Sequence, residues 1–237
     1  MLTTASIKQA ALAVGFDDCG VAAAAALSDE EYPLREWLRR GWNGDLDYME
    51  RNADKRMDPR LLVPGARSVI CCVSAYPPPS SRGGVAAYAR HRDYHKDIKA
   101  MLFALMQKLG IEGRAFCDTA PISDKHWAAR AGLGWIGRHT LLVTPHWGSW
   151  VNLGEIVTAE ECDSYASPLP SSCTSCNLCV EACRNGAIAA EGAPMIDVRR
   201  CTAYYTTHHP RPMPADLSDG GYSLGCDLCQ LACPFNR

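Results

Sequence analysis

The feature of this sequence that most directly implies chemistry is a run of four cysteines, CTSCNLCVEAC, at residues 173–183. Its spacing is C-x2-C-x2-C-x3-C, which is typical of bacterial iron–sulfur proteins. In ferredoxins with two clusters, the fourth cysteine of such a run ligates the other cluster. The run therefore predicts a second set of cysteine ligands elsewhere in the chain.

The second set lies at the end of the sequence, in CDLCQLACP at residues 226–234. This segment repeats the spacing without its first cysteine, and Cys201 is the only cysteine between the two runs. We therefore predict two 4Fe–4S clusters with ligands that cross between the runs. The first cluster is ligated by Cys173, Cys176, Cys179 and Cys233, and the second by Cys183, Cys201, Cys226 and Cys229.

Two structural zinc sites built from C-x2-C pairs are the alternative interpretation of the same cysteines. Zinc requires neither the third cysteine at x2 spacing nor the cysteine three residues further on, so the spacing favours iron–sulfur. Thirteen cysteines occur in 237 residues, and most lie near the C-terminus of a sequence without an export signal. This pattern indicates metal binding in a reducing compartment, and we expect a cytoplasmic protein.

A second candidate for chemistry is Asp118, which follows the expected short strand RAFCDT at residues 114–119. Domains of the α/β class usually place their ligands at strand ends. Burial among the apolar and small neighbours of Asp118 would favour a protonated carboxyl, which can donate a proton as a general acid. The alternative is a turn or helix-capping aspartate, a common role at strand ends. These neighbours are Phe116, Cys117, Ala120, Pro121 and Ile122.

The elements that must position these residues alternate between helix and strand over residues 1–165, which predicts an α/β (α+β) domain. Helices are expected at 4–15, 28–41, 88–109 and 123–134. Strands are expected at 68–76, 114–119, 139–144 and 149–158. After the linker signal SYASPLPSS at 164–172, cysteine dominates and periodicity fades, so a second domain is predicted over 166–237.

The composition excludes several classes of protein. Hydrophobic residues make up 47% and charged residues 21%, which is ordinary for a globular protein. The net charge of −2 lacks the basic footprint of a dedicated nucleic-acid binder. The most conspicuous apolar run, GVAAAAAL at 20–27, is far shorter than a membrane span, so no membrane partner is expected. GLGWIG at 132–137 follows a helix and precedes a strand, the reverse of a dinucleotide-binding turn.

Taken together, several segments resemble the epoxyqueuosine reductases, the cobalamin- and iron–sulfur-dependent enzymes of queuosine biosynthesis in tRNA. Both cysteine runs take part in this resemblance, which spans most of the chain. The further segments are GDLDYMERNADKR at 44–56, LVPGARSVI at 62–70, YARHRDYHK at 88–96, DTAPISDKHWAARAGLGWIGRHTLL at 118–142, GSWVNLGEI at 148–156 and DVRRCTAYYT at 197–206.

The resemblance implies a cobalamin-binding N-terminal domain followed by a bacterial ferredoxin-like domain with two clusters. The clusters would pass single electrons to cobalt, and the epoxide on a cyclopentane ring of the tRNA wobble base would be reduced. Water then leaves to give an alkene. Asp118 matches the aspartate of the family's D-S/T-A/G-P motif and is therefore the expected proton donor. The implied partners are the tRNA anticodon loop and an external electron donor.

The same resemblance implies a set of residues that contact cobalamin. They are Arg51, Asp118, Lys125, Leu142, Pro145, Leu153 and Asp227. The sequence departs from the family at Ser123 and Asp124, where leucine and glutamate are usual. The family also continues past its second cysteine run with a helical-repeat region that helps to hold tRNA, whereas this sequence ends at Arg237, so we expect either a short form or a trimmed sequence.

Two other functions remain compatible with the same motifs. A related corrinoid-dependent reductase could act on a small molecule, as reductive dehalogenases do. A non-catalytic iron–sulfur protein could pass electrons to a partner protein. Retention of cobalamin would exclude the simple carrier, and conversion of tRNA that carries epoxyqueuosine would exclude the small-molecule reductase.

Overall fold

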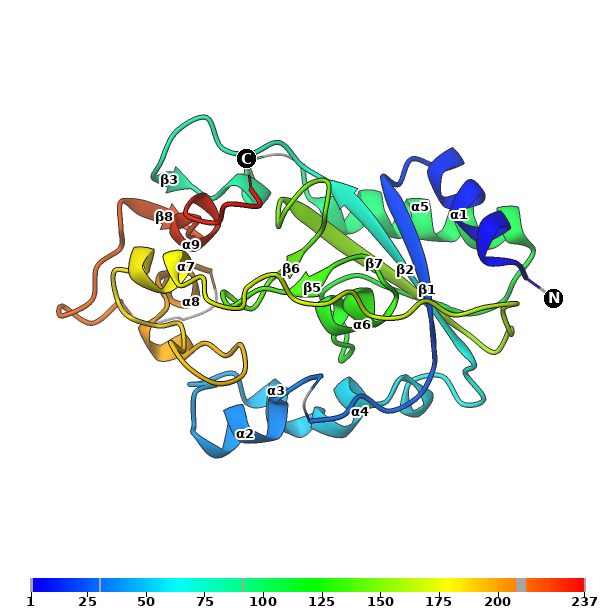
Figure 1. Ribbon diagram of the computed structural model, residues 1–237, viewed down its shortest axis with the longest axis horizontal. Helices are drawn as coiled ribbons and strands as arrows, with labels where there is room; N and C mark the ends of the chain where they lie inside the picture. Colours follow the sequence, from blue (N-terminus) through cyan, green and yellow to red (C-terminus); the bar gives the residue numbers. More distant parts are fainter. Residues whose placement is uncertain (1, 30, 91, 208–211, 237) are drawn as a thin grey trace.

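The computed structural model describes residues 2–29, 31–90, 92–207 and 212–236. At its centre is a four-stranded antiparallel sheet with the strand order β1-β2-β7-β4 (Figure 1). The two long inner strands are rich in valine and isoleucine, as expected of strands covered on both faces. The four strands are Asp18–Ala23 (β1), Ser68–Ala75 (β2), Arg114–Phe116 (β4) and Val151–Thr158 (β7).

Helices cover both faces of this sheet (Figure 1). On one face, α1 (Thr4–Ala13) and α5 (Tyr94–Leu109) form a core with the sheet that includes Ile98, Leu102 and Ile156. On the other face, α6 (Asp124–Arg130) packs fully buried Trp127 against Val69 and Val157. Alternate residues of one strand therefore enter different cores, as the pleat of a strand requires.

The remaining elements are short, and they join the sheet to the cysteine-rich part. Around the sheet lie α2 (Leu34–Arg39), α3 (Asp47–Arg51), α4 (Ala53–Met57), η1 (Pro59–Leu61), β3 (Gly84–Val85), η2 (Ala87–Ala89), β5 (Trp135–Ile136) and β6 (Leu142–Val143). The C-terminal part has α7 (Leu178–Ala182), η3 (Val198–Arg200), α8 (Thr202–Thr207), β8 (Tyr222–Leu224) and α9 (Leu228–Leu231).

The two parts of the chain are tied together by backbone and side-chain contacts. Strand β3 pairs in parallel with β8, although almost 140 residues separate them. The indole Nε1 of Trp37 donates to the carbonyl of Ile196 at 2.6 Å, and the Ser149 hydroxyl donates to Oε1 of Gln230 at 3.0 Å. The mixed α/β architecture is as expected, while the division of the chain at residue 166 stays a prediction.

Helix boundaries differ from the expected ones where a cap lies further along the chain. The helix expected from residue 88 begins at Tyr94, because the Asp93 carboxylate accepts the backbone N–H of His95 and caps it there. It ends at Gly110, whose φ of +64° fits the left-handed terminus that glycine favours.

The helix expected from residue 28 does not begin there, although Ser28 and Glu31 form a capping box. The backbone N–H of each residue donates to the side chain of the other, at 2.9 and 3.2 Å. Helix α2 begins only after Pro33, since the residue before a proline is disfavoured in the helical region. Glu31 instead binds Arg130 of α6; burial alone would raise the pKa of this carboxyl, but the guanidinium outweighs it and the pKa is lowered.

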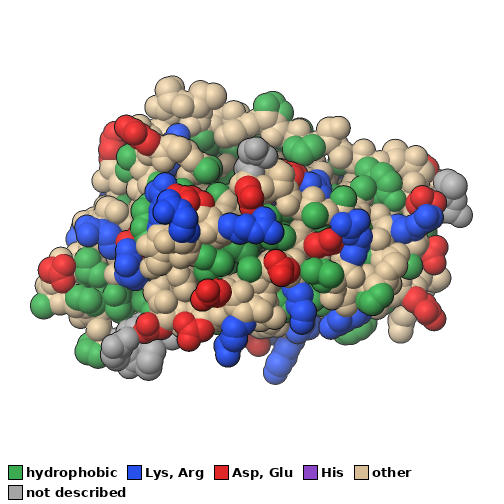
Figure 2. All heavy atoms as spheres, turned by 90° about the horizontal axis from the view of Figure 1, so that it is seen from below, with side chains coloured by type: hydrophobic (Ala, Val, Ile, Leu, Met, Phe, Trp, Pro, Cys, Tyr) green, Lys and Arg blue, Asp and Glu red, His purple; other side chains and the backbone are tan. Residues whose placement is uncertain are grey.

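The face that carries α2, α3 and α4 has basic and acidic side chains interspersed with apolar ones (Figure 2). Several of its arginines are held in short ion pairs, such as Arg39 with Glu36 and Arg60 with Asp58. Charges of both signs therefore alternate on this face, in line with the net charge of −2. None of the helices in the described part of the chain combines the length and apolarity needed to cross a bilayer.

Candidate active site

The eight predicted cluster cysteines gather around two separate cavities in the C-terminal part. One cavity is lined by Cys173, Cys176, Cys179 and Cys233. The other is lined by Cys183, Cys201, Cys226 and Cys229. All eight thiols are free, and the packed helices α7 and α9 bring the two runs side by side.

The cysteines stand around their cavities and do not converge on one point. Among the described residues, no three His, Cys, Asp or Glu side chains are placed to ligate a single metal ion. A 4Fe–4S cluster requires a wider arrangement than a single metal ion, because each of its four cysteine ligands binds a different iron atom of the cluster. The donor set of each cavity therefore fits a 4Fe–4S cluster.

A larger cavity, of about 400 Å³, lies between the sheet and the second cysteine set. Apolar and aromatic side chains from the N-terminal part, including Tyr76, Leu142 and Leu153, form one side of it. Residues of the C-terminal part form another side: Cys201, Ala203, Cys226, Cys229 and Gln230. A group bound there would contact both parts of the chain.

A second cavity, of about 250 Å³, opens next to the first and is also lined by aromatic rings. Tyr32, Trp37 and Tyr48 line it, together with Arg56. The two cavities share five lining residues: Asp118, Asp124, Lys125, Thr140 and Ile196. The wall between the cavities is therefore built by the loop after β4, the first residues of α6, and two residues from later loops.

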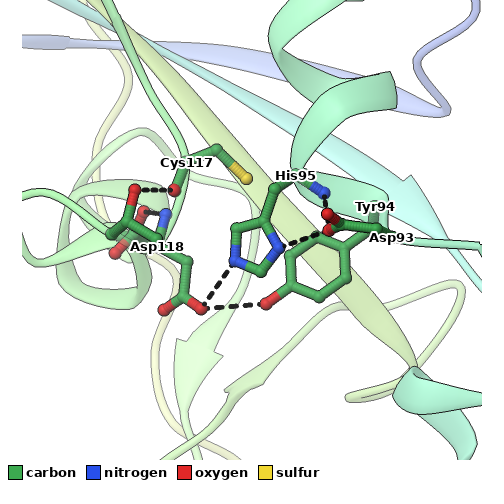
Figure 3. Close-up of polar contacts among 7 residues, drawn as sticks. Asp93, Tyr94, His95, Cys117 and Asp118 are labelled. Carbon is green, nitrogen blue, oxygen red and sulfur yellow. Dashed lines mark hydrogen bonds and ion pairs between the residues drawn. The ribbon is translucent and has the colours of Figure 1, made fainter.

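Asp118 stands in this wall with a left-handed backbone, φ +55° (Figure 3). Its Oδ2 accepts a hydrogen bond from the Tyr94 hydroxyl at 2.9 Å and lies 3.2 Å from Nε2 of His95. Nδ1 of His95 is in turn 2.7 Å from Oδ1 of Asp93. The carboxyl of Asp118 is thus oriented by two side chains at the start of α5.

The apolar surroundings expected for Asp118 are not found, and that expectation was wrong. The side chain is 63% exposed and its contacts are polar. The left-handed backbone turns it away from Phe116 and Ile122, which are buried in the core. Polar partners, rather than desolvation, therefore define the environment of this carboxyl.

Three residues that line the larger cavity together with Asp118 have shifted pKa values. Burial, reinforced by the nearby Asp118 carboxylate, raises the pKa of Tyr94 far above its ordinary value, so its hydroxyl remains a donor. Burial lowers the pKa of Lys125, although Asp124 and Asp118 oppose the shift. Burial, with the charge of Lys125, lowers the pKa of His139 to about 4, so this imidazole is neutral at pH 7.

Three of the expected cofactor contacts do not line the larger cavity. Arg51, at the end of α3, and Pro145, in the turn before β7, are exposed. Asp227 is fully buried beside Cys226; its Oδ2 accepts the Ala87 N–H at 2.9 Å, and burial raises its pKa. The other four, Asp118, Lys125, Leu142 and Leu153, do line that cavity.

Comparison with known proteins decides the family. Residues 56–119 match the family described as "Epoxyqueuosine reductase QueG, DUF1730", and residues 172–236 match "4Fe-4S double cluster binding domain". An epoxyqueuosine reductase of Cellulophaga algicola is 37% identical over 242 residues, covering 98% of this chain and 78% of the relative. The chain belongs to the epoxyqueuosine reductase family. The match at 172–236 also confirms iron–sulfur over zinc in the C-terminal part.

Solved structures of epoxyqueuosine reductases share the fold. One, a complex with an epoxyqueuosine-modified tRNA stem loop, superimposes with a TM-score of 0.85 at 27% identity. That match covers 98% of this chain but 64% of the solved chain. A catabolic reductive dehalogenase superimposes with a TM-score of 0.65 at 18% identity, which is a likeness of fold.

Two features of this epoxyqueuosine reductase site were not foreseen from its sequence. The first is Arg56, which lines the aromatic cavity, lies 5.6 Å from the Tyr48 ring and has a buried Nε without a hydrogen-bond partner among the described residues. Its place at the end of the quoted segment GDLDYMERNADKR was the available signal. The second is the pair of polar contacts that Tyr94 and His95 make with the Asp118 carboxyl, which form only because α5 and the loop after β4 lie next to each other.

Proposed function

We propose that this chain reduces epoxyqueuosine in tRNA to queuosine. The observation that carries the proposal is the position of Asp118 in the wall between two cavities, one of which is bordered by Cys226 and Cys229. A proton donor and a source of electrons then meet at one place. The solved relative with an epoxyqueuosine-modified stem loop supports the same substrate, and a tRNA substrate implies a cytoplasmic enzyme.

The eight cysteines are proposed to ligate two 4Fe–4S clusters in the crossed arrangement. Support comes from their distribution, because each predicted set of four lines its own cavity. The match to a double-cluster domain over residues 172–236 supports the cluster type. An external one-electron donor must refill the clusters after each turnover.

The larger cavity is proposed to hold cobalamin. Its position between the sheet and the second cysteine set fits a group that takes electrons from that cluster, and its aromatic and apolar walls fit a macrocycle. When bound, cobalamin supplies a metal centre that accepts and donates single electrons. Leu142 and Leu153 would contact it directly, and Lys125 and Asp118 would lie at its edge. For Arg51, Pro145 and Asp227 the proposal rests on family resemblance.

The smaller, aromatic cavity is proposed to receive the modified base. Reduction of the epoxide to an alkene consumes two electrons and two protons, and the epoxide oxygen leaves as water. Two clusters supply the two electrons. Both C–O bonds break and a C=C bond forms. Asp118, in its protonated form, donates one proton to the leaving oxygen and solvent supplies the other, while Tyr94 and His95 hold the carboxyl in place.

Anaerobic reconstitution with iron, sulfide and cobalamin, followed by assay on anticodon stem–loop RNA that carries epoxyqueuosine, tests this function. We expect visible absorption of retained cobalamin and conversion of the nucleoside detected by mass spectrometry. Retention of iron and sulfide without cobalamin and without conversion would instead identify an electron carrier. Retention of all cofactors without conversion would reject the proposed substrate.

A further inference from the structure

Glu155 is a buried carboxyl that the proposed chemistry does not use. It lies on β7 between Leu153 and Val157, on the face of the sheet that α6 covers, and its exposed fraction is 0%. Gly154 faces the opposite side, where an added Cβ would meet Ile98 and Leu102 of α5. A carboxyl in the middle of an apolar row is costly, so its surroundings must compensate it.

No ordinary hydrogen-bond donor provides this compensation. Within the described residues, neither Oε1 nor Oε2 of Glu155 accepts a hydrogen bond from an N–H or O–H group. The carboxyl instead lies beside the carboxyl of Asp124, at the first position of α6, which packs on β7, and the two groups interact electrostatically. Two carboxylates in contact cannot both be charged, so the pair must share a proton.

The geometry indicates which partner carries the proton. Oδ1 of Asp124 accepts the backbone N–H of Asp118 at 3.1 Å, which favours a charged Asp124. Burial raises the pKa of both carboxyls, but the Asp118 N–H opposes the shift at Asp124, whereas the nearby charge of Asp124 adds to the shift at Glu155, whose pKa lies well above its ordinary value. Glu155 is therefore the acid and the donor, and Asp124 is the carboxylate and the acceptor.

The hydrogen bond from Asp118 to Asp124 matters because of the backbone conformation of Asp118. A φ of +55° is uncommon for residues other than glycine and persists where surrounding contacts hold it. Glu155 also pairs through its backbone with Phe116, two residues before Asp118, in the register of β4 and β7. One residue of β7 thus supports the loop twice, through its backbone and through its side chain.

We propose that Glu155 is a positioning residue that, in its protonated form, donates to Asp124 and thereby fixes the left-handed turn that presents the Asp118 carboxyl between the two cavities. The role rests on the proposed function of Asp118. The titratable groups that interact electrostatically with Glu155 are Asp124 from α6, Asp118 and Cys117 after β4, and Cys71 and Cys72 from β2. Helix α5 lies on the opposite face of the sheet.

Two substitutions at Glu155 separate donation from simple filling of space. Glu155→Gln keeps a donor of the same shape, so we expect kcat close to that of the parent. Glu155→Leu fills the space without a donor, and we expect kcat to fall roughly 100-fold, the scale of a small misplacement of a reacting group, with KM unchanged. Val157→Ala, on the same buried face, is the control; it should lower the melting temperature without changing kcat.

The pH profile gives a readout that a merely structural role would not move. Loss of the Glu155 proton at alkaline pH should release the turn, so the kcat of the parent should fall there more steeply than the kcat of Glu155→Gln. Equal loss of kcat in the Gln and Leu variants, or a Leu variant with parental kcat and pH profile, would overturn the proposal.

Infrared spectroscopy of the protein without substrate separates this proposal from the proposed function. The parent at neutral pH should show the C=O band of a protonated carboxylic acid, and Glu155→Gln should lack it. Absence of the band in the folded parent would refute a protonated Glu155 whatever the enzyme turns over. A band that is present in a protein unable to convert epoxyqueuosine would instead refute the proposed function.

Discussion

Replacement of Asp118 by asparagine removes the proposed proton without disturbing the turn that carries it. Asparagine tolerates a positive φ as well as aspartate does, so the backbone at φ +55° should persist. Its amide oxygen can still accept the Tyr94 hydroxyl, which is 2.9 Å from Oδ2 in the parent. General acid catalysis contributes about 10²- to 10⁴-fold, so the barrier should rise by about 2.7–5.4 kcal/mol.

The assay is the single-turnover rate on stem–loop RNA that carries epoxyqueuosine, measured at matched iron and cobalamin content. Asp118→Asn should retain both cofactors and convert the RNA at least about 100-fold more slowly than the parent. Asp97→Asn is the matched control, because Asp97 is exposed on α5 and its ion pair with Arg92 is long, at 3.4 Å. An Asp118→Asn variant as fast as this control would remove Asp118 from the mechanism.

Three further outcomes are expected. Cys229→Ala should lower the iron content, measured by a ferrozine assay, by up to half. Cys71→Ala is the control: it removes a core thiol outside both cysteine cavities and should leave the iron content unchanged. Arg130→Gln should lower the free energy of unfolding by about 2 kcal/mol, or the melting temperature by about 4–8 °C, because the Arg130 guanidinium binds a half-buried carboxylate and two carbonyls. Arg35→Gln is the control, and it should change stability little because Arg35 forms an exposed ion pair. The folded-state pKa of Glu155 is raised, so its contribution to stability is present below pH 4.5 and is lost as pH rises. The free energy of unfolding of Glu155→Gln should therefore increase relative to that of the parent above pH 4.5, by up to about 1.4 kcal/mol per pH unit. Denaturant titrations at pH 5 and 8 measure this difference.

Local patterns were sufficient to predict the elements whose signals lie within a few residues. The β-branched run at 68–76 appears as β2, and the apolar stretch at 149–158 appears as β7. Helix α5 ends at Leu109, the end of the helix expected at 88–109, and Gly110 caps it. The cysteine spacing predicted an iron–sulfur module because its chemistry depends on contiguous residues, and the match at 172–236 confirms that module.

Features that depend on distant segments could not be predicted in the same way. Ser28 and Glu31 form a capping box, as their spacing suggests. Glu31 also binds Arg130 of α6, and helix α2 begins only after Pro33. The exposure of Asp118 follows from its positive φ and from contacts made by α5, neither of which its apolar neighbours reveal.

The contact between Asp124 and Glu155 is a further case of this kind. Asp124 and Glu155 are 31 positions apart in the sequence and meet only because α6 packs on β7. In the sequence, Asp124 was visible as a departure from the family pattern, but nothing near it indicated a buried partner. Long-range packing supplies such information, and local spacing does not.

Single turnover by a pre-reduced protein tests the central claim most directly, namely that cluster electrons and the Asp118 proton act on one epoxide. The reconstituted protein is reduced, freed of excess reductant and mixed with excess stem–loop RNA, and product and cluster absorption are followed together. Because two clusters hold two electrons and one epoxide consumes two, the account predicts about one queuosine per chain, formed as the clusters oxidise. Cluster oxidation without queuosine, or equally fast product formation by Asp118→Asn, would contradict it.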